Sequence, residues 1–479
     1  MTSTPPAPDG LTRRALIGRT AASGLGLAFA GSLSTVFGAS ASAAPAAGGA
    51  AAGSGYGPLI ADPAGLLALP RGFSYTVIAY DGTDAQRPGV PATVLDSGEP
   101  TPGDPDGTAS FVMAGGGSVL VNNHELSTTD GPAVPRLPGL TYDPGVGGGT
   151  TNIEVDKQGR RVREYVSLAG TDNNCAGGRT PWSTWLTCEE TESRAGSSGR
   201  TKDHGYVFEV DPYDNDLNRA PAPIKALGRF PHEAVTVDPD TGQVYETEDA
   251  SNPNGLVYRW TPPDSALPLG KGTLRGLADD AGTLDAMRAT SGGQFVPDLS
   301  VATRPGTTYD ISWVAIPDRD ARRVSTRKQV STATRSRKLE GMWWADGGSY
   351  FVASFARTSD GSAAQHDGQV WFLDPLAQTI TLSLQFAYTP GDQDGDPDGP
   401  DNITVSPYGG VILAEDGQGQ QHLVGASPSG EPFFLARNEH PDDSEFTGPN
   451  FSADKKTMFV NIQSPGYVLA IRGPFAAHR

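Results

Sequence analysis

The chain is poor in cysteine and in basic residues, and each shortage excludes a class of protein. Two cysteines among 479 residues, Cys175 and Cys188, allow one disulfide at most, which excludes a small disulfide-rich scaffold. The 36 basic residues against 55 acidic ones give a net charge of −19, which argues against nucleic acid or an anionic membrane as a partner. Long helix-periodic segments are also scarce, whereas 61 glycines and 40 prolines supply turns. This composition predicts an all-β protein.

The first 43 residues have the features of an export signal. A twin-arginine pair, Arg13-Arg14, precedes the apolar stretch LGLAFAGSLSTVFG, and Ala41-Ser42-Ala43 fits a cleavage site. A membrane anchor is disfavoured because this stretch is short and rich in small residues. We expect a twin-arginine signal peptide at 1–43, a flexible linker at 44–57 and a single domain at 58–479. The twin-arginine export machinery is then a partner, and the location is secreted, extracellular or at the cell wall, without a stable membrane anchor.

Six segments share one pattern, in which two apolar, β-rich runs surround a turn signal such as DPDTG, ADGG or SPYGG. We number them as the first to the sixth hairpin, at 108–125, 175–190, 232–249, 340–355, 401–416 and 449–463. A further β-type segment follows each one, and such a repeat predicts an all-β β-propeller of about six blades with loop insertions. The longest insertion, 261–338, carries a basic cluster that either is a solvated loop or captures an anionic substrate. The segment GFSYTVIAY at 72–80 is expected to pair with a C-terminal blade and close the ring.

Polar and acidic clusters stand at both ends of these hairpins. Because an antiparallel hairpin returns the end of its second strand to the start of its first, both clusters of one hairpin meet. In a ring of hairpins all the clusters would crowd around one mouth, where carboxylates repel one another unless cations neutralise them. The candidate metal ligands are Cys188, Glu189, Glu190, Glu233, Glu248, Asp249, Glu340, Asp401, Asn402, Glu415 and Asp416.

The donor types in this set are mixed. Carboxylate and amide oxygens suit Ca²⁺, whereas a thiolate and a histidine among carboxylates suit a transition metal such as iron. Two alternatives stay open: the acidic residues cap turns and satisfy backbone groups, or Cys175 and Cys188 form a disulfide. The sequence contains no G-x-S-x-G elbow and no G-x-x-x-x-G-K-[ST] loop, so a metal-activated oxygen nucleophile fits better than a serine mechanism.

Several stretches together resemble the PhoX-type alkaline phosphatases, a family of secreted metal-dependent propeller enzymes. They include VNNHE, NCAGGRTPWSTWLTCEE, GRFPHEAVTVDP, LEGMWW, DNITVSP and FTGPNFSADKKTMFVNIQSPG, and they fall in order across most of residues 70–475. The resemblance implies a mouth that holds two ferric ions (Fe³⁺) and calcium ions (Ca²⁺), with an oxo or hydroxo group that bridges the metals as nucleophile. It implies Cys188, Glu233 and Glu340 as iron ligands. It implies calcium sites at Glu189, Glu190, Glu248, Asp249, Asp401, Asn402, Glu415 and Asp416.

The fourth hairpin departs from the family pattern. That pattern has Arg-Pro-Glu where this chain has Arg337-Lys338-Leu339-Glu340, so the arginine stands one residue further from the glutamate. Arg337 and Lys338 are the residues predicted to bind the phosphate through charge-assisted hydrogen bonds.

The sequence therefore predicts an exported metal-dependent alkaline phosphatase, a phosphoric monoester hydrolase that acts on small-molecule phosphate esters and on some diesters. One alternative is another propeller hydrolase, such as a calcium lactonase, which would have one central calcium and no cysteine ligand. The other alternative is a secreted propeller that binds metal without catalysis.

Overall fold

Antiparallel strands form most of the regular structure in the computed structural model, which describes residues 55–391 and 395–475. All of these residues belong to one compact unit. The predicted signal peptide lies wholly outside the described residues, and the predicted linker lies outside them except for 55–57. Within the described part of the chain, no helix is both long and apolar enough to span a membrane.

All six predicted hairpins are present as antiparallel strand pairs. In chain order the pairs are β4 (Pro105–Val112) with β5 (Ser118–His124), β8 (Asn174–Arg179) with β9 (Trp185–Glu189), β11 (His232–Val237) with β12 (Val244–Glu248), β18 (Leu339–Ala345) with β19 (Gly348–Ala353), β22 (Pro400–Val405) with β23 (Val411–Glu415), and β26 (Phe446–Phe451) with β27 (Thr457–Ile462).

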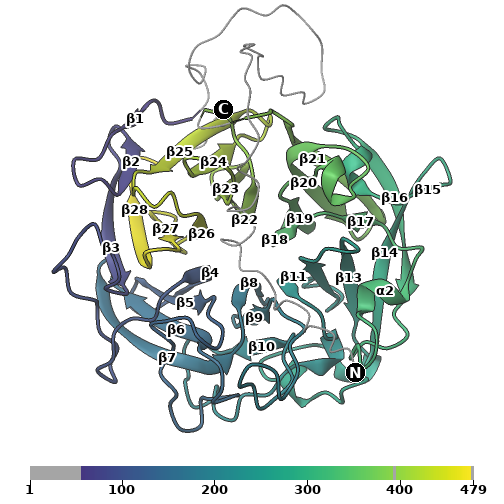
Figure 1. Ribbon diagram of the computed structural model, residues 1–479, viewed down its shortest axis with the longest axis horizontal. Coiled ribbons are helices and arrows are strands. Elements are labelled where there is room, and N and C mark those ends of the chain that lie inside the picture. Colours follow the sequence, from purple (N-terminus) through teal and green to yellow (C-terminus); the bar gives the residue numbers. More distant parts are fainter. Residues whose placement is uncertain (1–54, 392–394, 476–479) are drawn as a thin grey trace, which may run out of the picture. The chain divides into compact units, whose positions relative to one another are not determined.

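The first strands of these hairpins contact one another in cyclic order, β4 to β8, β11, β18, β22, β26 and back to β4. Figure 1 shows them innermost, with the remaining strands arranged outward from them. The outer strands are β6 (Gly148–Val155), β7 (Arg161–Thr171), β10 (Val207–Val210), β13 (Gly255–Thr261), β14 (Thr283–Ser291), β15 (Gln294–Val296), β16 (Thr308–Ala315), β17 (Arg335–Ser336), β20 (His366–Asp374), β21 (Thr379–Ala387), β24 (His422–Ala426) and β25 (Pro432–Asn438). This radial arrangement of antiparallel sheets is that of a β-propeller, as predicted.

The N-terminal and C-terminal strands close the ring. Strand β3 (Ser74–Tyr80) pairs antiparallel with β28 (Tyr467–Arg472), so the sheet β26-β27-β28-β3 joins both ends of the described chain. The rings of Tyr80 and Tyr467 stack with their centroids 4.5 Å apart in this pair. The first short strands, β1 (Leu59–Ile60) and β2 (Leu67–Pro70), extend the neighbouring sheet through β25. The predicted pairing of 72–80 is therefore confirmed, and it covers edges that would otherwise be open.

The segment 261–338 is not only a loop. Strands β14 and β16 within it bridge the third and fourth hairpins, so both hairpins share one 11-stranded sheet. The single α-helix of the described residues, α2 (Thr326–Gln329), is also in this segment, and short 3-10 turns lie at Lys225–Leu227, Asp264–Ala266, Leu274–Gly276, Leu299–Val301 and Thr358–Asp360.

The basic cluster of this segment mostly anchors it. Arg319 donates to the carbonyls of Ala226, Ala281 and Gly282, and Arg327 pairs with Glu192 and Glu248 at 2.9 Å. Arg319 and Arg327 are thus paired with groups of the protein itself. Arg337 and Lys338, at the end of the segment, reach the candidate site described below.

The core lies between the sheets because strands with one apolar face stack against each other. Strand β21 shows the alternation: Ile380, Leu382, Leu384 and Phe386 are buried, while the residues between them are half-buried. Each such side chain contributes about 1.5–3 kcal/mol through removal of apolar surface from water. This packing fixes the distance between neighbouring inner strands and so fixes the geometry at the ring's centre.

Candidate metal centre

Every inner strand among the described residues contains a β-bulge at the same place. In the second hairpin, Asn174 pairs with Glu189 and Gly177 pairs with Thr187, so Cys175 and Ala176 together oppose one residue. The same shift of one residue occurs in the other five hairpins. A bulge bends its strand and changes the direction of a side chain. The same bulge bends all six inner strands, which surround one centre.

The first residue of each bulge supplies a ring of side chains. In hairpin order this ring is Asp106, Cys175, Glu233, Glu340, Asp401 and Gly448. The five that carry side chains are all at most 1% exposed. Five side chains of types that can bind metal therefore lie in equivalent positions of a repeated backbone feature, and four of them belong to the groups described below.

The second residue of each bulge brings the strands close together at the axis. These residues are Gly107, Ala176, Ala234, Gly341, Asn402 and Pro449. A Cβ atom on Gly107 would lie 2.6 Å from Cα of Ala176, and one on Gly341 would lie 2.9 Å from Cα of Asn402. The cavity that several of these residues line has a volume of only about 20 Å³, so the axis is nearly filled beside the ring of ligands.

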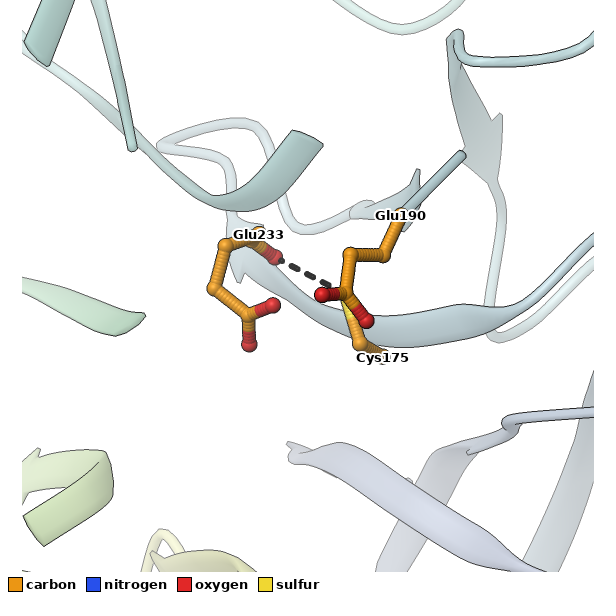
Figure 2. Close-up of side chains that lie close together, drawn as sticks. All are labelled: Cys175, Glu190 and Glu233. Carbon is orange, nitrogen blue, oxygen red and sulfur yellow. Dashed lines mark hydrogen bonds between the residues drawn. The ribbon is translucent and has the colours of Figure 1, made fainter. Parts of the chain in front are cut away.

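Three groups of ligand atoms connect across the inner strands. Within each group the ligand atoms lie within 4.8 Å of one another, and neighbouring groups share Glu233 or Asp401. The groups are Cys175–Glu190–Glu233, then Glu233–Glu340–Asp401, and then Asp401–Asp416–Glu445. Figure 2 shows the first group, in which the dashed line joins Cys175 Sγ to the main-chain oxygen of Glu233 at 3.6 Å.

The donor sets of these groups fit the expected metals. The first group offers sulfur and two carboxylates, which suits a transition metal such as iron. The second and third offer carboxylate oxygens alone, which suits a hard cation such as Ca²⁺. Burial raises the pKa of the Cys175 thiol well above its usual value, and the charges of Glu233 and Glu190 raise it further. A bound cation would reverse this shift because coordination deprotonates a thiol.

Both cysteines are free and buried, so the structure contains no disulfide between them. Cys175 lies in the bulge and belongs to the first ligand group, whereas Cys188 is the residue of β9 that opposes the bulge. Both cysteines border the hydrophobic cluster that contains Leu186 and Val207, but only Cys175 belongs to a ligand group. The sequence prediction chose Cys188 as the thiolate ligand, but the structure brings Cys175 to the ligand position.

Three predicted ligands, Glu189, Glu248 and Glu415, hold loops instead. Each is the last residue of a second strand. Glu189 accepts hydrogen bonds from the backbone N–H groups of Asp172, Gly205 and Tyr206, and contacts His204 Nδ1 at 2.7 Å.

Glu248 and Glu415 repeat this role in the third and fifth hairpins. Glu248 accepts from the N–H of Leu256 and the hydroxyl of Tyr258, and Glu415 accepts from the N–H groups of Asp398 and His422. These three carboxylates therefore satisfy backbone N–H groups, as the alternative interpretation expects, and none of them belongs to a ligand group described above.

The residue that follows each of these glutamates lies at the mouth. Glu190 and Asp416 belong to ligand groups, and Asp249 lies 3.7 Å from Nη1 of Arg337. Asn402 lies beside the groups: its side chain donates to Asp401 at 2.9 Å and accepts from Gly448 N at 2.6 Å. Asn402 thus contacts a candidate ligand directly.

The structure adds residues that the sequence prediction left out of the ligand set. Cys175 and Glu445 join the groups, and Glu445 lies immediately before β26. Glu125 is held by the side-chain amides of Asn173 at 3.1 Å and Gln463 at 2.6 Å, beside the first and sixth hairpins. The signal for Cys175 was its place at the start of a first strand, the position that holds Glu233, Glu340 and Asp401 elsewhere.

Two basic side chains border the mouth at the fourth hairpin. The guanidinium of Arg337 lies 3.7 Å from Asp249 and 3.6 Å from Asp360, and its Nε is buried without a hydrogen-bond partner in the described part of the chain. Lys338 Nζ lies 3.1 Å from both Glu340 Oε1 and Asp416 Oδ2. The mouth therefore combines buried acids with one loosely held and one tightly held cation.

Comparison with known proteins adds a family match. The family described as Alkaline phosphatase PhoX matches residues 54–164 and 158–466. No curated protein matches the chain.

Solved structures match at low similarity. They include a gluconolactonase from Xanthomonas campestris, at 13% identity over 81% of this chain and 99% of that one, with a TM-score of 0.36. They also include the PQQ domain of a pyranose dehydrogenase from Coprinopsis cinerea, at 9% identity over 85% and 97%, with a TM-score of 0.34. The Pan2 WD40 domain from Neurospora crassa matches at 9% identity over 84% and 97%, with a TM-score of 0.32. At these scores the structural matches carry no argument about activity.

Proposed function

Because this chain belongs to the PhoX alkaline phosphatase family, we propose that it hydrolyses phosphate monoesters, and some diesters, at the mouth of its propeller. The observation that carries the proposal is the contact of Lys338 with members of the second and third ligand groups, with Arg337 next to it in the chain and beside Asp249. Phosphate hydrolysis needs this combination, since the transition state carries negative charge on oxygens that cations stabilise.

The proposed cofactors are Fe³⁺ and Ca²⁺. Cys175, Glu190 and Glu233 would hold iron, because this group alone among the three offers sulfur. Glu340, Asp401, Asp416 and Glu445 would hold calcium through oxygen. When bound, the ions supply Lewis-acid charge that activates the nucleophile and stabilises the phosphoryl oxygens.

The side chains position the substrate and set the local charge. Arg337 makes no ion pair shorter than 3.6 Å, and its guanidinium would donate to phosphate oxygens. Asn402 donates to the candidate ligand Asp401 and limits how that ligand moves. The six bulges hold the ligand-bearing backbone on strands rather than on loops, which keeps the site preorganised.

The expected cellular context also belongs to this proposal. We infer export through the twin-arginine machinery from the Arg13-Arg14 pair, and a secreted location on the extracellular or cell-wall side. Small-molecule phosphate esters are the proposed substrates. Nucleic acid is not a proposed partner because the chain has a net charge of −19.

Hydrolysis of p-nitrophenyl phosphate tests the proposal. The purified protein is assayed as isolated, after removal of metals with a chelator, and after addition of iron and calcium together or singly. We expect turnover in the isolated and reconstituted samples and a loss of at least about a hundredfold in the stripped sample. Full turnover after complete metal removal would contradict the proposal, and calcium-only activity would assign a different metal chemistry.

A further inference from the structure

Lys338 occupies the space between two of the ligand groups. Its Nζ lies 3.1 Å from Glu340 Oε1, a member of the second group, and 3.1 Å from Asp416 Oδ2, a member of the third. Lys338 is 6% exposed, so its ammonium has exchanged most of its contact with water for these two carboxylates. An ammonium is a compact point charge with three donors, and it can neutralise two carboxylates much as a small metal ion does.

The backbone holds Lys338 in this place. Its φ of 44° is uncommon for a residue other than glycine, and its carbonyl accepts a hydrogen bond from Ser354 N at 2.8 Å. Backbone strain of this kind persists where the surrounding structure enforces it, often beside functional sites. The Nζ also lies 5.6 Å from the centroid of the Phe355 ring, which gives the cation a further favourable contact.

The fourth hairpin has a shortage of acids at this point. The position after the last paired residue of the second strand holds Glu125, Glu190, Asp249 and Asp416 in four hairpins, but Ser354 in the fourth and Gln463 in the sixth. The fourth hairpin therefore contributes one carboxylate, Glu340 of its bulge, and none from the position after its second strand. Four other hairpins have an acid at that position. Of the two hairpins that have none there, the fourth is the one where Lys338 brings a positive charge to two ligand carboxylates.

We propose that the Lys338 ammonium is a built-in cation of the mouth, which bridges Glu340 and Asp416 and takes the place of one divalent metal ion. The second and third groups contain five carboxylates, Glu233, Glu340, Asp401, Asp416 and Glu445, and this ammonium neutralises part of their charge at all metal concentrations. Lys338 is thus a positioning residue, whereas Arg337, with ion-pair distances of 3.6 and 3.7 Å, stays available for phosphate. The inference rests on the proposed function, because it assumes that the groups bind metal.

The number of metal ions bound per chain tests the inference. Wild-type protein, Lys338→Met and Lys338→Arg are stripped of metal, reloaded with iron and excess Ca²⁺, passed through a desalting column and measured by elemental analysis. We expect Lys338→Met to retain one more Ca²⁺ per chain than the wild type, because the empty position between two carboxylates then suits that ion. Lys338→Arg, which keeps the charge, should retain the wild-type number.

Each outcome decides the matter. If the wild type and Lys338→Met bind the same non-zero number of calcium ions, the inference is overturned but the proposed function stands. If the wild type binds no metal, the proposed function is overturned. If Lys338→Met does not fold, Lys338→Gln serves as the second neutral variant. Refolding of a neutral variant only when Ca²⁺ is present, with the extra ion bound, supports the inference. Failure of both neutral variants to fold even with Ca²⁺ overturns it.

Discussion

Glu189 and Glu190 are adjacent in the chain, but their carboxylates act in different places. Glu189 accepts three backbone N–H groups and contacts His204, and so fixes the loop that leads into β10. Glu190 lies within 4.8 Å of ligand atoms of Cys175 and Glu233 at the mouth. Adjacent strand-end residues point in different directions, which separates a carboxylate that holds backbone groups from one that belongs to a candidate ligand group.

Substitution by glutamine is expected to affect stability at Glu189 and iron content at Glu190. Glu189→Gln should lower the free energy of unfolding by at least about 2 kcal/mol, because it loses charge-assisted hydrogen bonds in a buried site. Glu190→Gln should leave the stability of metal-free protein nearly unchanged and reduce its iron content. Urea unfolding in chelator and elemental analysis measure the two effects. Equal loss of stability in both variants would show that the two side chains do not differ in this way.

The two cysteines provide a matched pair for the metal centre. Cys175→Ala is expected to lose iron, because it removes the one sulfur atom of the first ligand group. Cys188→Ala should keep iron and lose about 1 kcal/mol of stability, because it only removes a packed atom from the hydrophobic cluster. Iron per chain and thermal unfolding measure these outcomes. If Cys188→Ala lost iron and Cys175→Ala kept it, Cys188 would be the thiolate ligand, as predicted from the sequence.

Arg337→Ala should impair phosphate binding. Loss of one charge-assisted donor corresponds to about 1.5–3 kcal/mol, so kcat/KM should fall by about 10- to 100-fold. The control is Arg322→Ala, since the Arg322 side chain is 72% exposed and pairs only with Asp318 among the described ion pairs. Steady-state kinetics with p-nitrophenyl phosphate provide the measurement. An unchanged kcat/KM in Arg337→Ala would remove this residue from the site.

Stability should depend on pH through His204. Burial alone lowers the pKa of His204, but the carboxylates of Glu189, Asp172 and Asp143 outweigh it and raise the pKa to about 9. Because the folded pKa is above the unfolded value of about 6.5, the stabilisation is complete below pH 6.5 and is lost as the pH rises through 9. The difference is at most roughly 3 kcal/mol.

The corresponding experiment compares wild type and His204→Gln in chelator. Urea unfolding at pH 6 and pH 10 should give a larger fall in the free energy of unfolding for the wild type, because the variant has no charge to lose at this position. The same pH dependence in both proteins would mean that His204 is already neutral at pH 6.

Much of the fold follows from the sequence because turn signals and β-rich runs mark the hairpins directly. All six hairpins and the pairing of 72–80 with the C-terminal strand were predictable on that basis. The bulges were not, because one extra residue in a strand changes the register without changing the composition. This is why Cys188 was preferred to Cys175, and why Glu189, Glu248 and Glu415 could not be separated from the residues that follow them.

The long segment 261–338 and Glu445 illustrate a second limit. Strands β14 and β16 pair with distant parts of the chain, which no local pattern of 261–338 indicates. Glu445 belongs to the third ligand group because the closed ring places the sixth hairpin beside the fifth, which carries Asp401 and Asp416. Tertiary packing, rather than a motif, determines that contact.

Anomalous scattering at the iron absorption edge, recorded from crystals of the reconstituted protein, tests the central claim most directly. We expect a strong iron peak bounded by Cys175 Sγ and the carboxylates of Glu190 and Glu233. An iron peak beside Cys188, or no iron peak in protein that hydrolyses p-nitrophenyl phosphate, would contradict it.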